Sequence, residues 1–199
     1  MKYAKFLSLL SLVFLAACGP STKIEKTWTD PSFTAGNVNF HKVLCVAQMP
    51  DESSRRIAED KMVAAFKNIT GVASYKYLQP SDTATGAVDA KLKADGFDGV
   101  VIMRLSAVDK STSYVPGTTY GGYYGGRYGY YGGYGGYGTS GYYQEDKTYY
   151  VETNFYSVDE SKLLWSATTS SLNPSKLDKS LDHVIDELKI QLKSQKLMK

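Results

Sequence analysis

A long run of glycine and tyrosine interrupts the second half of this sequence. From residue 120 to residue 137 every position is Gly or Tyr, except Arg127. Glycine at this density loses too much backbone entropy on ordering to build a packed helix or strand. We therefore expect a flexible insertion at about 116–143, placed at the surface between two regular elements.

The side chains of this run are candidate contacts with a partner, because tyrosine is amphipathic and loses little side-chain entropy when it becomes ordered. Such an insertion at a loop tip can also be tolerated filler. Against filler, so many exposed tyrosines favour unwanted association unless a partner covers them. The candidate contact residues are Tyr120, Tyr123, Tyr124, Arg127, Tyr128, Tyr130, Tyr131, Tyr134 and Tyr137.

The segments that flank the run, 100–108 and 149–158, are predicted to be strands because β-branched, aromatic and other apolar residues recur in them. In a hairpin centred near Tyr128, opposite charges and apolar residues face each other, as cross-strand pairing favours. The charge pairs are Arg104 with Glu152, Asp109 with Lys147 and Lys110 with Asp146, and the apolar pairs are Leu105 with Val151 and Val101 with Phe155. We expect Arg104 and Glu152 to form a structural pair on neighbouring antiparallel strands.

Strand and helix patterns alternate along the rest of the chain. Val43 to Ala47 is apolar at every position, which is typical of a central strand covered on both faces. Amphipathic helices are expected after a capping segment at 51–54, at about 85–94, and after Asn173–Ser175. The predicted strands are 38–47, 72–78, 100–108, 149–158 and 162–170. The order β-α-β-α-β-β-β-α predicts an α+β fold, a mixed α/β sandwich with three amphipathic helices on a mixed sheet of about five strands.

The N-terminus carries a targeting pattern. Lys2 and Lys5 precede an apolar run over 6–17, which is too short for a permanent membrane-spanning helix. The run ends in Leu15-Ala16-Ala17-Cys18, which closely resembles the lipobox of bacterial lipoproteins. This resemblance implies that the thiol of Cys18 is acylated, and that acyl chains such as palmitate hold the mature chain to a membrane.

The lipobox resemblance divides the chain into three parts. Residues 1–17 are a signal peptide, 18–36 are the lipidated N-terminus and tether, and 37–199 form a single α/β domain with the Gly/Tyr-rich insertion. Trp28, within the tether, is expected to pack on the domain. Gly19 stands where an Asp retains lipoproteins in the inner membrane in enterobacteria-like sorting. We therefore expect an envelope protein on the outer membrane, facing the periplasm, rather than on the inner membrane.

Charge and cysteine content exclude several functions. Removal of Lys2 and Lys5 leaves 21 basic residues against 20 acidic ones, a balance that argues against binding to nucleic acid or to anionic lipid through a polybasic patch. Once Cys18 is acylated, Cys45 has no cysteine left to pair with. It is expected to be a small buried hydrophobic residue in a strand.

Recognisable catalytic chemistry is missing from the sequence. His41 and His183 are the only histidines, and neither belongs to a cluster with metal-ligand spacing. No nucleophile elbow, phosphate-binding loop or zinc-protease motif occurs, and Asp159-Glu160 is explained by turn chemistry. We expect no catalytic residues, no metal and no cofactor. A hydrolase of the envelope whose catalytic residues are dispersed in the sequence is the weaker alternative.

Five short segments together resemble a group of bacterial envelope lipoproteins without an assigned activity, which often carry a Gly/Tyr-rich insertion at this place. These segments are Trp28–Ser32, Arg55–Asp60, Gly96–Val101, Val151–Asn154 and Leu163–Ala167. The resemblance covers essentially the whole mature chain. It implies an envelope lipoprotein with one α/β domain, and it carries over no catalytic residue.

Two non-catalytic functions are compatible with these features. The first is a binding or assembly module of the cell envelope, in which an exposed sheet surface or the Gly/Tyr-rich run contacts a protein partner. The alternative is a lipoprotein that binds the cell wall or another glycan by stacking tyrosine rings on sugars. Glycan sites usually add Asn, Asp or Gln beside the rings. The run over 120–137 contains none of these, which favours the protein partner.

Overall fold

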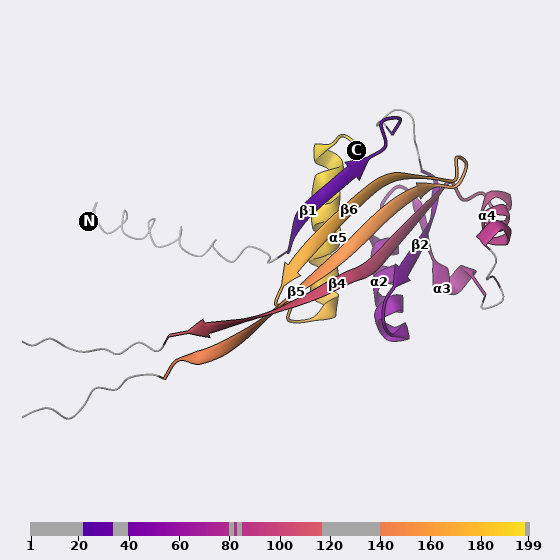
Figure 1. Cartoon of the computed structure of the whole chain (residues 1–199). Coiled ribbons are helices and arrows are strands. Elements are labelled where there is room, and N and C mark those ends of the chain that lie inside the picture. Colours follow the sequence, from indigo (N-terminus) through magenta and orange to yellow (C-terminus); the bar gives the residue numbers. More distant parts are fainter. Residues whose placement is uncertain (1–21, 34–39, 80–81, 83–84, 117–139, 198–199) are drawn as a thin grey trace, which may run out of the picture.

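The protein folds around one mixed β-sheet of six strands (Figure 1). The computed structural model describes residues 22–33, 40–79, 82, 85–116 and 140–197. The strands are β1 (Thr22–Thr29), β2 (Lys42–Gln48), β3 (Thr70–Ala73), β4 (Gly99–Val115), β5 (Tyr142–Ser157) and β6 (Lys162–Leu172). Their order across the sheet is β1-β6-β5-β4-β2-β3. β2 is parallel to β3 and β4, and the other neighbouring strands are antiparallel. This confirms the predicted α+β fold, with six strands in place of about five.

The additional strand is β1, which forms where the tether was expected. β1 pairs with β6 along its whole length, and the hydroxyl groups of Thr22 and Ser171 are 2.8 Å apart in a buried contact. A register shift between Ile24 and Lys26 breaks the alternation of inward and outward side chains. Because that alternation is the sequence signal of a strand, the sequence pattern does not identify β1. The expected tether over 18–36 is therefore wrong for Thr22–Thr29.

In the described residues four helices accompany the sheet: α2 (Glu52–Ala65), α3 (Ser74–Tyr77), α4 (Thr85–Ala94) and α5 (Leu177–Ser194). The three amphipathic helices of the prediction correspond to α2, α4 and α5. The strand predicted over 72–78 ends at Ala73, where the chain turns into α3. Gly71 lies in β3, where an added Cβ would come 3.1 Å from the Cα of Val63. The glycine therefore permits a close approach of β3 to α2.

The main core lies between the sheet and the helices α2 and α5. Trp165 is fully buried there, and Leu181, Val184 and Leu188 of α5 pack against the sheet with Met62 of α2. A second, smaller cluster on the opposite face of the sheet joins Leu44 of β2 to Leu92 and Phe97 from α4 and the turn after it, and to Val158. α4 therefore covers that opposite face only near β2.

Cys45 lies inside the main core, as expected. Its side chain is fully buried, and burial, with a smaller contribution from the charge of Glu59, raises its thiol pKa to about 12. The thiol is therefore protonated at neutral pH and behaves as a small apolar side chain.

The hairpin of β4 and β5 confirms half of the predicted register. Arg104 faces Glu152, and the apolar pairs Leu105–Val151 and Val101–Phe155 also form. Beyond Leu105 the register shifts by one residue at Ser106, whose hydroxyl donates a hydrogen bond to the carbonyl oxygen of Tyr150 at 3.1 Å.

The predicted pairs Asp109–Lys147 and Lys110–Asp146 are therefore wrong. Asp109 faces Thr148 and Lys110 faces Lys147. An extra residue in one strand moves every later side chain of that strand to the other face relative to its expected partner. The predicted register assumed an uninterrupted ladder.

The outer part of this hairpin extends beyond the other strands, and we term it the arm: Lys110–Val115 of β4 paired with Tyr142–Lys147 of β5 (Figure 1). β4 pairs with β2 no further than Arg104, and β5 pairs with β6 no further than Thr148. Asn173 fixes the base of the arm. Its backbone N–H donates to the carbonyl oxygen of Lys147 at 2.8 Å, and its side-chain oxygen accepts from the Lys147 N–H at 2.7 Å.

Candidate functional site

One face of the sheet is covered by helices, and in the described part of the chain the other carries no helix over β1, β6 and β5, although Asn154, Thr168 and Ser170 on it are buried by their neighbours. α5 packs on β1 and β6, and α2 packs on β2 and β3, all on the same face. On the opposite face the register places a group of mostly polar side chains that we term the open face. It consists of Lys26 and Trp28 on β1, Ser166, Thr168 and Ser170 on β6, Tyr150, Glu152 and Asn154 on β5, and Arg104 on β4.

An ordered polar triad lies in the middle of the open face. Arg104 donates to Oε2 of Glu152 from Nε at 3.2 Å and from Nη2 at 2.7 Å, and Nδ2 of Asn154 donates to Oε1 of the same carboxylate at 2.8 Å. The hydrogen bond from Asn154, followed by those from Arg104, lowers the pKa of Glu152 below its ordinary value. Both carboxylate oxygens are engaged, so the half-exposed guanidinium of Arg104 is held in a fixed position.

A line of small side chains runs along β6 next to this triad. Ser166 lies between Trp28 and Asn154, and Thr168 lies between Lys26 and Glu152. Trp28 leaves 48% of its surface exposed, contrary to the expectation that it packs on the domain. Tryptophan side chains are mostly buried in folded proteins, so this exposure is unusual. Trp28 therefore marks the β1 side of the open face as a candidate contact.

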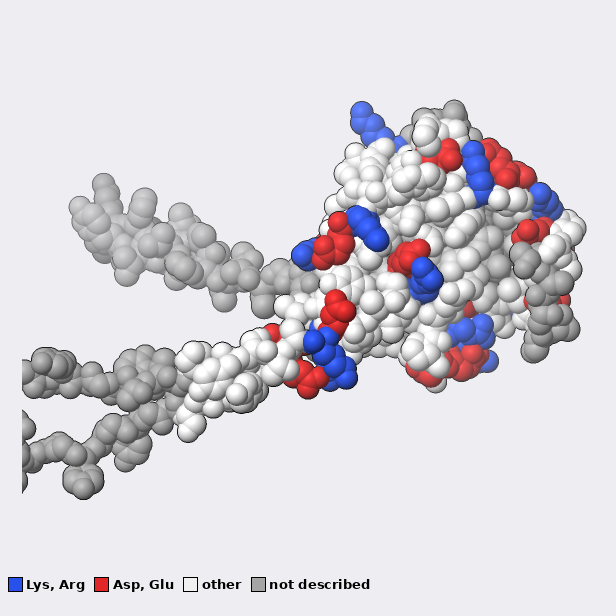
Figure 2. Space-filling view, in the orientation of Figure 1, with Lys and Arg blue, Asp and Glu red and all other residues white. Residues whose placement is uncertain are grey.

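The charges of this side of the molecule are mixed in sign. Figure 2 shows acidic and basic side chains in adjacent groups, separated by wide uncharged surface, without a patch of one sign. At one edge Glu25 accepts a hydrogen bond from the hydroxyl of Ser170 at 2.6 Å and forms an ion pair with Lys23 at 3.1 Å. The hydrogen bond from Ser170 is the main reason that the pKa of Glu25 is lowered. Such a surface suits a partner of mixed polarity better than a polyanion.

Some of the site residues predicted from the sequence lie in the described part of the chain and others do not. Arg104 and Glu152 are brought together as expected. Cys18 and all the candidate contact residues of the Gly/Tyr-rich run lie outside the described residues. Sequence reasoning missed Trp28 as an exposed residue, and it also missed the exposed tyrosines of the arm, Tyr114, Tyr142 and Tyr143. The signal for the arm was available, because tyrosine and polar residues continue past the predicted strand ends.

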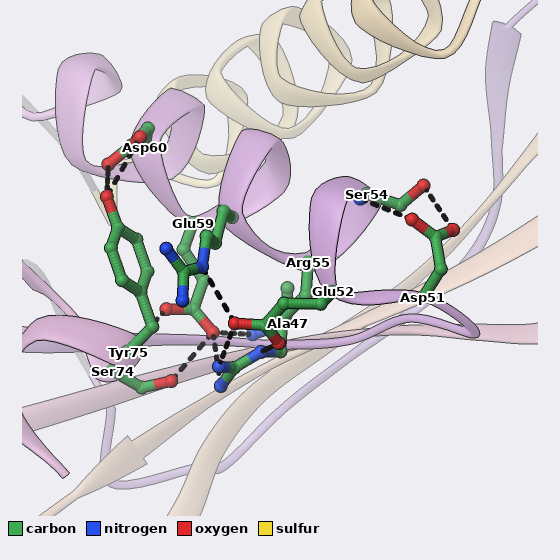
Figure 3. A network of polar contacts seen from close by, with 10 residues as sticks. Ala47, Asp51, Glu52, Ser54, Arg55, Glu59, Asp60, Ser74 and Tyr75 are labelled. Carbon is green, nitrogen blue, oxygen red and sulfur yellow. Dashed lines mark hydrogen bonds and ion pairs between the residues drawn. The ribbon is translucent and has the colours of Figure 1, made fainter. Parts of the chain in front are cut away.

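A fully buried carboxylate was also missed, and it holds the covered face together (Figure 3). Glu59 of α2 accepts hydrogen bonds from the backbone N–H of Ala47 at 3.1 Å, the hydroxyl of Ser74 at 2.6 Å and the backbone N–H of Tyr75 at 3.0 Å. Nη1 of Arg55 lies 3.8 Å from it. The three hydrogen bonds join α2 to β2 and to the start of α3. Glu59 has no exposed surface, so this network is structural.

Two apolar hollows lie on the covered face. One of about 280 Å³ lies near the base of the arm and is bordered by Met49, Leu105, Tyr149 and Leu177. The other, of about 40 Å³, lies between α2 and α5 and is bordered by Thr153, whose buried hydroxyl has no partner among the described residues. Within the described ranges no three His, Cys, Asp or Glu side chains are placed to hold a metal ion. No helix of the described chain is long and apolar enough to cross a membrane.

A scan against protein-family models finds no match to this chain, and a search of the curated proteins also finds none. Solved bacterial proteins of similar fold do exist. The PelC L103M dodecamer from Paraburkholderia phytofirmans is 11% identical over 84% of this chain and 95% of that chain, with a TM-score of 0.44. A second PelC dodecamer from the same organism is 13% identical over 89% and 99%, with a TM-score of 0.43.

Lipoprotein GNA1162 from Neisseria meningitidis is also similar in fold. It is 12% identical over 77% of this chain and 99% of that chain, with a TM-score of 0.41. At these identities and TM-scores, the similarity transfers neither an activity nor an assembly to this chain.

Proposed function

We propose that this protein is a membrane-anchored bacterial lipoprotein that acts as a non-catalytic binding or assembly module of the cell envelope, with a protein partner docking on the open face. The observation that carries the proposal is the half-exposed Trp28 on the same face as the ordered triad of Arg104, Glu152 and Asn154, with Ser166 of β6 between Trp28 and Asn154. Trp, Tyr and Arg are the residues that most often dominate the energy of protein interfaces.

Because the side chains of the triad are already fixed, binding a partner costs less conformational entropy. An exposed arginine ordinarily loses rotamer entropy when a partner fixes it. Two hydrogen bonds to Glu152 already hold the guanidinium of Arg104. Trp28 is a rigid ring on a paired strand. Both groups are therefore placed for contact before a partner arrives.

The chemistry of the open face supports binding over catalysis. The residues that define it include neither histidine nor cysteine, and its one carboxylate is engaged on both oxygens. A carboxylate with a lowered pKa and two fixed donors is a poor general base. The alternative, a glycan bound beside Trp28, is less well supported, because Nδ2 of Asn154 is already bonded and its Oδ1 is buried.

The anchor in this proposal is the acylated Cys18 at the end of Leu15-Ala16-Ala17-Cys18. The outer membrane, with the domain facing the periplasm, follows from Gly19 and belongs to the same proposal. A Cys18→Ala variant would remain an uncleaved precursor without acyl label. Normal processing and acyl-dependent membrane binding of that variant would remove the anchor from the account.

The docking surface is tested with Trp28→Ala and a matched control, Ile190→Ala. Ile190 is 60% exposed on α5, on the other side of the sheet, and both changes remove an exposed apolar side chain. We expect Trp28→Ala to lose the proteins that copurify with the wild type from detergent-solubilised envelopes, and Ile190→Ala to keep them. Unchanged copurification by Trp28→Ala at equal expression and fold would contradict the protein-binding proposal. Trp28-dependent sedimentation with peptidoglycan would instead support the glycan alternative.

A further inference from the structure

The arm and the N-terminus leave the domain at the same end. β1 is antiparallel to β6, and β6 is antiparallel to β5, so β1 and β5 run in the same direction. The N-terminal end of β1, at Thr22, therefore lies at the end of the sheet from which the arm projects (Figure 1). Thr22 faces Ser171, which in turn faces Tyr149. Tyr149 marks the level in β5 at which β1 begins.

Measured from the level of Thr22 and Tyr149, the arm extends further than the segment between Cys18 and Thr22 can reach. Tyr142, at the end of the arm, is seven residues beyond Tyr149, about 23 Å at about 3.3 Å per strand residue. Cys18 is four residues before Thr22, so its Cα lies within about 14 Å of that of Thr22 even in a fully extended chain.

The short tether also restricts how the domain can lie on a membrane. The opposite end of β1, at Thr29, is seven residues from Thr22, again about 23 Å. This exceeds the reach of Cys18, so the domain cannot rest on the membrane by that end of the sheet. In the remaining orientations the arm points into the lipid surface, lies along it or rises from it only at a shallow angle.

The residues of the arm suit the headgroup region of a bilayer. Its charged residues, Lys110, Glu145, Asp146 and Lys147, lie toward its base, whereas Ser111–Val115 and Tyr142–Gln144 carry no charge. Figure 2 shows the same division, with coloured groups where the arm joins the body and white surface further out. Tyr114, Tyr142 and Tyr143 are all more than half exposed. Tyrosine is the side chain, with tryptophan, that gathers at membrane–water interfaces.

We propose that the uncharged outer part of the arm, with Tyr114, Tyr142 and Tyr143, binds in the lipid headgroup layer of the membrane to which Cys18 is anchored. This inference rests on the acylated Cys18 of the proposed function. The arm and the acyl chains then form two attachment points, and together they fix the orientation of the open face relative to the membrane. A two-stranded hairpin without further support is marginally stable in water, and lipid contact supplies the missing support.

The test places an environment-sensitive fluorophore at the arm and at a distant control site. Tyr143→Cys and Glu160→Cys are labelled with a nitrobenzoxadiazole group in the full-length acylated protein. Cys45 does not compete, because it is fully buried and its pKa is about 12. Glu160 is exposed in the turn between β5 and β6, at the other end of the sheet. The proteins are reconstituted in vesicles of phosphatidylethanolamine and phosphatidylglycerol.

We expect the label at position 143 to shift its emission to shorter wavelength on reconstitution and to be quenched by headgroup nitroxide lipids, while the label at 160 stays water-exposed. A label on the paired strand, at Ser113→Cys, should respond like that at 143, which guards against a local folding defect. Water-like emission at both arm positions in protein that floats with the vesicles and carries acyl label would overturn the inference. Protein that fails to float or to carry acyl label would instead contradict the anchor of the proposed function.

Discussion

Replacement of Glu59 is the sharpest test of how this fold is held together. Glu59→Ala removes the acceptor for three donors: the backbone N–H groups of Ala47 and Tyr75 and the hydroxyl of Ser74. The hydroxyl can rotate to another acceptor and the Tyr75 N–H is only part-buried, but the Ala47 N–H stays buried without a partner. A buried donor without a partner costs about 1–3 kcal/mol. The lost packing of the side chain adds to this.

We therefore expect Glu59→Ala to lower the free energy of unfolding by about 3–5 kcal/mol, the range typical of breaking a buried charged network. The Glu59→Gln variant keeps the shape of the side chain and one acceptor oxygen, but its NH₂ group faces one of the donors. Its loss should be smaller, about 1–3 kcal/mol. Because domains of this size are stable by about 5–15 kcal/mol, the loss expected for the Ala variant is a large share of the total stability.

Urea unfolding followed by circular dichroism measures these differences, provided that the slope with denaturant is unchanged. Asp60→Ala is the matched control on the same helix. Asp60 is half-exposed and accepts only from the exposed Tyr75 hydroxyl and Lys76, so its removal should cost no more than about 1 kcal/mol. A loss below about 1 kcal/mol for Glu59→Ala, or equal losses for Glu59→Ala and Asp60→Ala, would refute the reasoning.

Three further predictions concern other parts of the chain. Glu152→Lys should destabilise the domain by about 1 kcal/mol, because it places a second positive charge opposite the half-exposed Arg104. Adding Arg104→Glu to this variant should restore stability in thermal melts. Hydrogen bonds from Arg55 and then Arg56 lower the pKa of Glu52 from 4.5 to about 2. The folded state therefore gains stability from the ionised Glu52 above pH 4.5 and loses it as the pH falls toward about 2, so the stability difference from Glu52→Gln should shrink in acid unfolding curves. Replacing residues 120–137 with a short Asn-Gly turn should leave the melting temperature nearly unchanged, since loop closure changes by only about 0.6 kcal/mol per doubling of length.

The parts of the fold that the sequence predicts well are those with unbroken periodicity. The apolar stripe of α5, with Leu181, Val184, Ile185, Leu188 and Leu192 buried, follows a helical period closely. The apolar run of β2 from Val43 to Ala47 identifies a central strand, and it is parallel to both its neighbours. In these segments local pattern and tertiary packing agree, so the pattern alone is informative.

Bulges account for two of the errors. The shift at Glu25 hides β1, and the shift at Ser106 moves the residues of two predicted charge pairs out of register with each other. A bulge adds one residue to one strand, and its position depends on tertiary contacts such as that of the Ser106 hydroxyl. No local sequence signal marks either position.

The candidate site was predictable only where two charges faced each other in register. Arg104 and Glu152 could be paired by arithmetic along the hairpin. The open face could not, because its members come from β1, β4, β5 and β6, and the order of strands across a sheet is set by long-range packing. Glu59 did leave a signal, since it is an acid next to Ala58 and Met62 on the apolar side of α2.

The central claim, that a protein partner docks on the open face, is tested most directly by site-specific photocrosslinking in living cells. A benzophenone amino acid replaces Trp28 in one strain and Ile190 in another, both exposed positions on opposite sides of the sheet. The account predicts a discrete crosslinked species containing a second protein from position 28 and none from position 190. Crosslinks from position 190 alone, or none from position 28 while the protein is folded and acylated, would contradict it.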